Sequence, residues 1–330
     1  MRIRLSIGTA AALGLAQLKT DAPTTTAYLM DIGGRCAYNC AFCAQARTAT
    51  GGDDRLSRVI WPAFELADVV GPLRIAADEG RIMRACIQVT MNTGSFQRTL
   101  DILDAVAPIL SLPVSVSTNI QAVSQVQTLF AHGAARVSIA LDAATQPLHD
   151  RVKGTGYKHK MELLTECADR YPGRISTHFI VGLGESEEDV IRAIAAMYDR
   201  HVTVGLFAFT PLKGTRMADA LPPEAGTYRR VQLANWLMKF RGARPDAMTF
   251  QDGRLVSLGG WHDEALKVAL TGEPFRTAGC KNCNRPYYNE NPGHGVMYNY
   301  PRALKAAEAL NAAKETGLFS GGLNDEMEIR

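Results

Sequence analysis

The sequence predicts an α/β fold with a parallel sheet. Its 330 residues are 46% hydrophobic and 21% charged, a composition typical of a globular protein with a large core. Short runs rich in β-branched residues alternate with amphipathic stretches, and strands that alternate with helices form parallel sheets. The alternation alone fits two architectures, a doubly wound sheet and a partial (β/α)6 TIM-like barrel.

Each expected element follows from a local pattern. Six buried runs predict strands over 26–32, 86–91, 114–118, 136–141, 175–181 and 203–209. Amphipathic periodicity predicts helices over 61–79, 97–110, 122–131, 159–168, 187–200, 227–240 and 303–314. The apolar stretch 7–16 follows Arg2 and Arg4 and superficially copies a signal peptide, but Thr9 and two glycines interrupt it. We therefore expect a helix there that caps the barrel or packs on it.

These patterns divide the chain into three parts: an N-terminal helical segment (1–25), the barrel (26–265) and a C-terminal extension (266–330). Within the extension, 279–301 is rich in Gly, Pro, Asn and Tyr and has neither helical nor strand periodicity. Because it contains cysteines and aromatic residues, we expect an ordered loop that folds back over the barrel mouth. A polar tail follows the last helix.

Composition limits the partners and the compartment. The net charge is +3 without a basic run, which argues against a nucleic-acid partner. No apolar run reaches the roughly 20 residues that a membrane span needs. Five of the seven cysteines lie in closely spaced groups typical of metal sites, so a secreted disulfide framework is not expected. Reduced thiolates predict a cytoplasmic protein.

Cys36, Cys40 and Cys43 form the most informative motif, with the spacing C-x3-C-x2-C. Three thiolates so close can bind three irons of a four-iron cluster and leave one iron open, whereas electron-carrying cubanes have four cysteine ligands. A zinc site is the alternative, but it usually takes four ligands from two paired groups. The motif follows the first strand directly, which fits a barrel whose chemistry lies at the carboxyl ends of its strands.

With the aromatic Phe42 just before the last cysteine, this loop resembles the radical S-adenosylmethionine (SAM) superfamily. The resemblance implies a (β/α)6 barrel and a [4Fe-4S] cluster held by Cys36, Cys40 and Cys43. It further implies that the open iron chelates SAM and that a low-potential electron donor reduces the cluster. SAM is then cleaved to methionine and a 5′-deoxyadenosyl radical. Phe42 would pack beside the adenine.

Seven residues at the ends of four further strands are candidate SAM contacts: Thr90, Asn92, Thr118, Asn119, Asp142, Ile180 and Gly182. Resemblance to biotin-synthase-like enzymes implies that Asp142 accepts hydrogen bonds from the ribose hydroxyls, and that Ile180 and Gly182 contact the adenine. Asp142 could instead cap the next helix. Gly182 could simply belong to a strand-to-helix turn.

A second group of thiols is expected around Cys280 and Cys283, which have the C-x2-C spacing common to zinc and iron–sulfur sites. Two ligands are not enough, and Cys86 is the better third candidate because it begins the second strand inside the barrel. Cys167 lies late in a helical stretch and is expected to be a plain buried thiol. Either an auxiliary [4Fe-4S] cluster or a structural zinc ion fits the pair.

The span 28–209 looks like biotin synthase, but Ser115 and Ser176 stand where that enzyme has cluster cysteines. The segment 279–301 resembles the biotin-synthase-like proteins that form two-component lipoyl synthases. This implies a sulfurtransferase that acts with a second radical SAM component on an octanoylated lipoyl-domain protein. Single-chain lipoyl synthase is a poorer match, because its N-terminal auxiliary cysteine motif is missing. A radical SAM mutase or isomerase with a structural metal, and an iron–sulfur carrier, are the alternatives.

Overall fold

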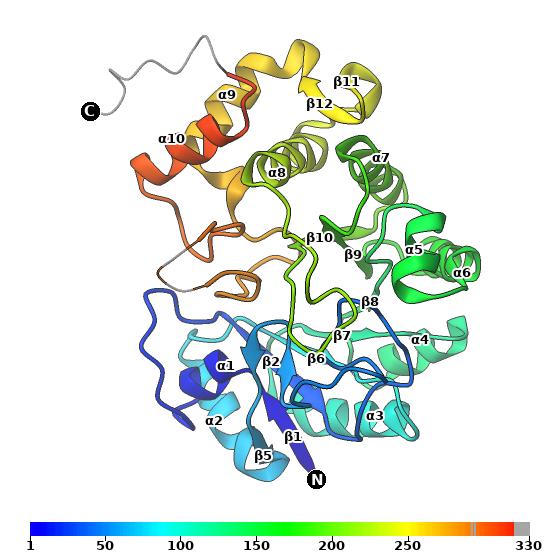
Figure 1. Ribbon diagram of the computed structural model, residues 1–330. Coiled ribbons are helices and arrows are strands. Elements are labelled where there is room, and N and C mark those ends of the chain that lie inside the picture. The colour runs from blue at the N-terminus through cyan, green and yellow to red at the C-terminus, as the bar shows by residue number, and fades with distance from the viewer. Residues whose placement is uncertain (292, 294, 320–330) are drawn as a thin grey trace.

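Six parallel strands form the centre of the computed structural model, which describes residues 1–291, 293 and 295–319 (Figure 1). They are β2 (Thr26–Asp31), β6 (Arg84–Gln88), β7 (Val114–Thr118), β8 (Arg136–Ile139), β9 (Ile175–Val181) and β10 (Thr203–Ala208). Their order in the sheet follows the chain, β2-β6-β7-β8-β9-β10. In a doubly wound sheet the order of the strands reverses at a switch point. The unbroken order found here therefore favours the partial barrel and confirms the predicted fold class.

Helices cover the outside of this barrel (Figure 1). They are α2 (Leu66–Asp78), α3 (Ser95–Val106), α4 (Val123–Ala131), α5 (Gln146–Lys153), α6 (Tyr157–Arg170), α7 (Glu187–Tyr198) and α8 (Ala225–Arg241). All but α5 were expected from the sequence. Except for α5, whose Leu148 and Val152 belong to a separate small cluster, their buried faces join those of the strands in one hydrophobic core that extends from Ile3 to Phe319. No helix in the described part of the chain is long and apolar enough to cross a membrane.

The N-terminus differs from expectation. The expected helix is present but short, α1 (Ile7–Ala12), and β1 (Arg2–Leu5) precedes it as an additional strand. β1 pairs antiparallel with β2 and with β5 (Ala63–Glu65), so the sheet continues beyond the parallel strands. The signal for β1 was the alternation of charged and apolar residues, since Ile3 and Leu5 are fully buried. A small hairpin, β3 (Arg55–Leu56) with β4 (Val59–Ile60), lies between the first cysteine motif and α2.

The C-terminal extension packs on α8. It contains α10 (Ala306–Glu315) and the second half of α9 (His262–Thr271), which begins before the predicted boundary, and the hairpin of β11 (Thr249–Gln251) and β12 (Arg254–Ser257) precedes it. Short 3-10 turns cover Ala107–Ile109, Pro245–Ala247, Gly259–Trp261 and Glu273–Phe275. Only α10 was expected from the sequence. Of the predicted polar tail, residues 320–330 lie outside the described residues.

The open side of the partial barrel is closed by residues 277–291, here called the seam segment, which lies between β10 and the N-terminal strands in Figure 1. Arg285 donates to the carbonyl oxygen of Leu206 on the edge strand β10 (3.0 Å), and its guanidinium lies 3.9 Å from the ring centroid of Phe207. Its backbone N–H donates to the hydroxyl of Tyr28, on β2 (3.2 Å). Residues 279–291 of the loop predicted from composition therefore pack against both edges of the barrel, and Arg285 satisfies a carbonyl oxygen of the edge strand that a missing strand would leave unpaired.

Candidate active site and its two cysteine groups

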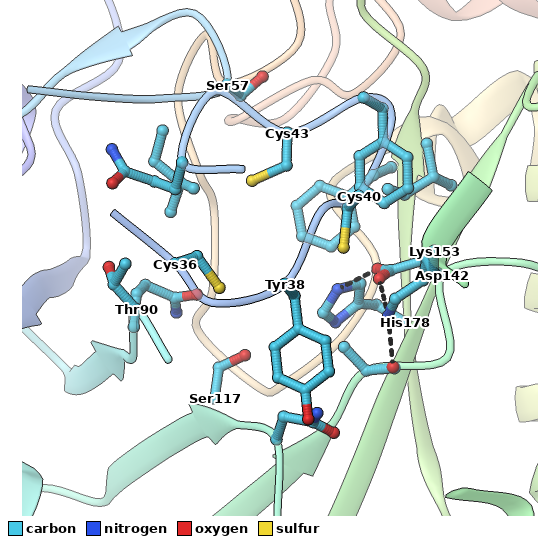
Figure 2. A pocket seen from close by; sticks show the side chains of 18 of the residues that line it. Cys36, Tyr38, Cys40, Cys43, Ser57, Thr90, Ser117, Asp142, Lys153 and His178 are labelled. Carbon is cyan, nitrogen blue, oxygen red and sulfur yellow. Dashed lines mark hydrogen bonds and ion pairs between the residues drawn. The ribbon is translucent and has the colours of Figure 1, made fainter. Parts of the chain in front are cut away.

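The first cysteine group lies at the carboxyl ends of the parallel strands, in the loop that follows β2. Backbone hydrogen bonds fix this loop: the N–H of Cys36 donates to Gln45 O (3.0 Å), and the N–H of Cys43 donates to Cys40 O (3.2 Å). The side-chain amide of Gln45 donates to Arg55 O (2.6 Å) and ties the loop to the β3–β4 hairpin. In Figure 2 the sulfur atoms of Cys36, Cys40 and Cys43 lie around one shared space.

That space is a cavity of about 240 Å³ at the barrel mouth. Besides the three cysteines it is lined by six further residues that the sequence singled out: Phe42, Thr90, Thr118, Asn119, Asp142 and Ile180. Residues separated by more than 100 positions in the sequence thus meet at one site, as strand ends of a parallel barrel should. Phe42 and Ile180 contribute an apolar wall, because both pack against the small core cluster that contains Leu183 and Phe209.

Asn92 and Gly182 support this wall rather than line it. The side-chain amide of Asn92 donates to Gly34 O (3.0 Å) and so holds the cysteine loop. Gly182 has φ +100°, and a Cβ there would lie 2.8 Å from Cδ of Pro223. Its N–H donates to the carboxylate of Glu185 (2.8 Å). Gly182 is therefore needed for a tight turn and close packing, whereas its contact with adenine stays a prediction.

Asp142 occupies the polar side of the cavity in a left-handed conformation, φ 64°. Its carboxylate forms an ion pair with Lys153 and another with Nε2 of His178 (2.7 Å). Burial alone would raise the pKa of Asp142, but its contacts with Lys153 and His178 outweigh burial and hold the pKa well below its usual range. The N-cap of α5 is Thr145, so the alternative role of Asp142 as a helix cap is wrong. The ribose role stays a prediction.

Several lining residues were not predicted from the sequence, namely Tyr38, Ser57, Gln88, Ser117, Lys160, His178 and Phe207. His178 had a usable signal, since it lies two residues from Ser176 and from Ile180 on β9 and so shares their face. Lys160 had none, because the pattern did not resolve α5 from α6. Burial and the neighbouring Lys153 lower the pKa of Lys160 to about 7.

The thiols of the first group suit an iron–sulfur cluster. Burial raises the pKa of Cys40, and raises that of Cys43 to about 12. Buried thiols of this kind lose their protons when a metal ion binds to the sulfur. Among the described residues no three His, Cys, Asp or Glu side chains are arranged to hold a metal ion. A four-iron cluster makes a different demand, because each of its cysteines binds a separate iron.

The second cysteine group consists of Cys86 on β6 with Cys280 and Cys283 nearby, whereas their role as ligands of one site stays a prediction. Cys86 and Cys283 pack against the same buried cluster of Tyr28, Met30 and Trp61. Burial, and then the nearby Cys283 and Cys280, raise the pKa of Cys86 to about 12. Cys167 is fully buried in α6, as expected of a plain core thiol.

This second group enters the barrel from the opposite end. Thr25 and Thr26 donate to Asn282 O (2.7 and 3.2 Å), and Arg84 donates to Lys281 O (2.8 Å). These donors lie at the amino ends of β2 and β6, so the expectation that the whole loop covers the barrel mouth is wrong for its cysteines. It is correct for Tyr288, which lines the mouth cavity.

Gln88 and Trp61 connect the second group to its surroundings. The amide of Gln88 lines the cavity and donates to Sγ of Cys86 (3.0 Å). The hydroxyl of Tyr28 lies 3.2 Å from Sγ of Cys283. The indole N–H of Trp61, 1% exposed, has no hydrogen-bond partner in the described structure. A buried donor without an acceptor, beside two thiols, fits a site that receives a sulfide-rich anionic group.

Solved structures with a similar fold support the barrel assignment. A structure of HydG, a maturase of the [FeFe]-hydrogenase, matches with a TM-score of 0.50 at 10% identity, covering 64% of this chain and 49% of that one. HydG from Carboxydothermus hydrogenoformans matches with 0.50 at 14% identity, covering 66% and 51%. Methylornithine synthase (PylB) matches with 0.50 at 13% identity, covering 69% and 77%. The match thus spans about half the length of the HydG chains. At these identities the likeness shows the fold alone.

Comparison with curated protein sequences finds no match. The family model of the radical SAM superfamily matches residues 30–197, about half of the 330-residue chain. The matched region contains the end of β2, the three-cysteine loop, the strands β3 to β9 and the polar strand ends that line the cavity. The chain therefore belongs to the radical SAM superfamily.

Proposed function

We propose that this enzyme is a radical SAM sulfurtransferase, one component of a two-component lipoyl synthase. Its substrate would be an octanoyl chain carried on a lipoyl-domain protein, and its partner a second radical SAM component. The observation that carries the proposal is the convergence of Cys86, Cys280 and Cys283 inside the barrel, connected through Gln88 to the mouth cavity. The resemblance of the segment 279–301 to two-component lipoyl synthases supports the choice of substrate.

The residues around the cavity have distinct tasks in this reaction. Cys36, Cys40 and Cys43 would hold a [4Fe-4S] cluster, which together with SAM and one electron supplies the power to remove a hydrogen atom from an unactivated carbon. Phe42 and Ile180 offer an apolar wall to the adenine. Lys160 also lines the cavity, and its ammonium form would suit the carboxylate of SAM.

The second group would hold an auxiliary [4Fe-4S] cluster as the source of sulfur. For each sulfur, the substrate loses one C–H bond and gains one C–S bond. The hydrogen atom would leave with the adenosyl carbon, and an auxiliary cluster, when bound, would supply the sulfide and take up the remaining electron. The chain's own contribution is positional: Gln88 and Tyr28 hold Cys86 and Cys283, and the buried lining keeps water from the radical.

The deciding experiment uses a variant with Cys36, Cys40 and Cys43 all replaced by alanine, reconstituted without oxygen. It should not cleave SAM, yet should retain about four irons and four sulfides at the second group. One zinc and no sulfide would remove the sulfur-insertion proposal. A radical SAM mutase or isomerase with a structural metal would then be the better reading, and the fold similarity to methylornithine synthase is compatible with it.

A matched variant tests the sulfur source directly. Cys280→Ala/Cys283→Ala should still cleave SAM in the presence of an octanoylated lipoyl domain and the second component. Mass spectrometry should find sulfur added by the unchanged protein and none added by the variant. Sulfur added equally by both would exclude the second group as donor.

A further inference from the structure

A second and larger cavity adjoins the mouth cavity. Its volume is about 730 Å³, within the range of roughly 300–1,000 Å³ typical of ligand sites. It lies between the N-terminal segment and the seam segment, and side chains such as Ile7, Ala11, Val59 and Pro286 make its wall mainly apolar. Nothing in the radical chemistry at the mouth requires this space.

The two cavities share a boundary. Gln88, Phe207 and Tyr288 line both of them. Tyr28 and Trp61 also line the larger cavity, and both belong to the cluster against which Cys86 and Cys283 pack. A ligand that fills the larger cavity and passes this boundary therefore reaches the space beside both cysteine groups.

Two large apolar side chains lie at the outer rim of the larger cavity. Leu18 and Ile60 line it and remain 44% and 45% exposed, beside the exposed charged residues Lys19, Asp21 and Arg58. Leaving large apolar side chains in water sacrifices burial energy, so their place at the entrance of a cavity suits a binding function.

We propose that the larger cavity is the channel for the extended acyl chain of the substrate. The chain enters past Leu18 and Ile60 and lies along the apolar wall beside α1. It passes between the contacting rings of Phe207 and Tyr288 on one side and Gln88 on the other, which places its reactive carbons between the two cysteine groups. This inference rests on the proposed function for the identity of the chain. The mainly apolar wall favours an aliphatic ligand over a nucleotide or a sugar, because many polar groups of those ligands would stay unpaired.

Chain length gives the test. Peptides that carry an octanoyl-lysine or a butanoyl-lysine are titrated by calorimetry into the reconstituted protein with SAM but without reductant, so that no turnover occurs. Each buried methylene contributes about 0.8 kcal/mol, and the octanoyl peptide should bind at least tenfold more tightly than the butanoyl peptide. Ala11→Phe narrows the channel and should remove most of this preference. Ala307→Phe, the same change at an exposed position of α10, should keep it.

A second variant guards against misfolding at Ala11. Leu18→Asp/Ile60→Asp changes only exposed positions at the rim and should weaken binding of the octanoyl peptide at least tenfold. Equal affinity for the two peptides in the unchanged protein, or unchanged binding by both channel variants, would overturn the channel. Length-dependent binding that the variants abolish, without any sulfur added during turnover, would keep the channel and reject the proposed function. Sulfur insertion that both channel variants leave intact would keep the proposed function and reject the channel.

Discussion

Asp142 places a carboxylate, an ammonium group and an imidazole at one point of the cavity wall. Its side chain is 8% exposed and contacts both Lys153 and His178. Its backbone also bridges β8 to β9, because its carbonyl accepts from the N–H of Ile180 (2.8 Å). A ribose hydroxyl bound at this point would meet an acceptor whose charge is already fixed by two neighbours.

We predict that Asp142→Asn weakens SAM binding about tenfold or more, since a charge-assisted hydrogen bond contributes roughly 1.5–3 kcal/mol. The variant should also lose about 3–5 kcal/mol of stability, because Lys153 stays buried without its carboxylate. Binding is measured by equilibrium dialysis of SAM, and stability by denaturant titration.

The double variant Asp142→Asn/Lys153→Met separates the two effects. Removing the buried ammonium should restore most of the stability while SAM binding stays weak. If SAM binding recovers together with stability, Asp142 only supports the fold of the wall.

At the residue scale, spacing alone identified the residues whose neighbours in sequence are also neighbours in space. Cys36, Cys40 and Cys43 lie in one loop, and their grouping needed no tertiary information. The pairing of Asp142 with His178 could not be predicted without tertiary information, because it depends on the register that brings β8 beside β9. The contact between Tyr28 and Cys283 joins residues 255 positions apart, and no local pattern encodes it.

At the element scale, the strands were predictable because each is a buried β-branched run. β7 and β9 begin and end where predicted, whereas β6 begins at Arg84, two residues early, and ends at Gln88. The start of β6 was not predicted because Arg84 is a charged residue. In the structure it is buried and donates a hydrogen bond to the hydroxyl of Ser115 (2.6 Å). Short helices and hairpins such as α5 and β11–β12 were missed, since they are too brief for a clear period.

The helix α5 carries a histidine that gives the fold a pH dependence. His149 is 2% exposed, its Nδ1–H donates to Gly154 O (3.0 Å), and its Nε2 has no partner among the described residues. Burial, and then Lys153 and Lys160, lower the pKa of His149 from 6.5 to about 4. As the pH falls below 6.5 the unfolded chain takes up a proton that the folded chain refuses, so stability is lost between these two values.

We predict that the free energy of unfolding falls by about 1 kcal/mol more in the unchanged protein than in His149→Gln between about pH 7 and about pH 5.5. Acid effects on the metal sites are common to both proteins and cancel in this difference. His132→Gln, at a more exposed histidine paired with Asp104, is the control and should behave like the unchanged protein. Parallel pH curves for His149→Gln and the unchanged protein would contradict the assignment.

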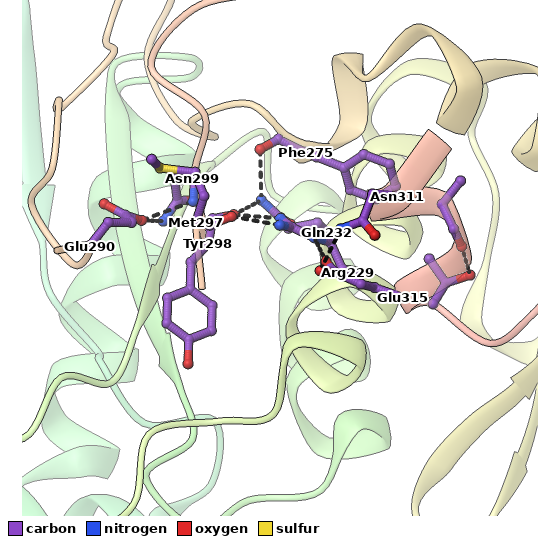
Figure 3. A network of polar contacts seen from close by, with 11 residues as sticks. Arg229, Gln232, Phe275, Glu290, Met297, Tyr298, Asn299, Asn311 and Glu315 are labelled. Carbon is purple, nitrogen blue, oxygen red and sulfur yellow. Dashed lines mark hydrogen bonds and ion pairs between the residues drawn. The ribbon is translucent and has the colours of Figure 1, made fainter. Parts of the chain in front are cut away.

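At the scale of the whole molecule, the C-terminal extension completes the barrel. Tyr228 and Arg229 on α8 fix the chain that returns from the seam segment, as Figure 3 shows for Arg229. Arg229 is 1% exposed and donates to Tyr298 O (2.8 Å) and to the carboxylate of Glu315 on α10 (2.8 Å). Asn299 accepts from Tyr228 (2.9 Å) and donates its backbone N–H to Glu290, at the end of the seam segment (2.9 Å).

This arrangement makes the second cysteine group depend on α8, whereas the first group is held by the loop after β2. We predict that Arg229→Met destabilises the extension by about 2–4 kcal/mol, because buried carbonyl groups lose a charged donor. The seam segment should loosen, and iron should be lost from the second group first. Iron content should fall toward that of one cluster while SAM cleavage persists, and hydrogen exchange should rise in residues 277–300.

Arg276→Met, which removes an exposed pair with Glu273, should change neither measurement, since such pairs contribute little. Loss of both clusters in parallel would show that the barrel and its extension unfold as one unit, and that the second group has no separate support.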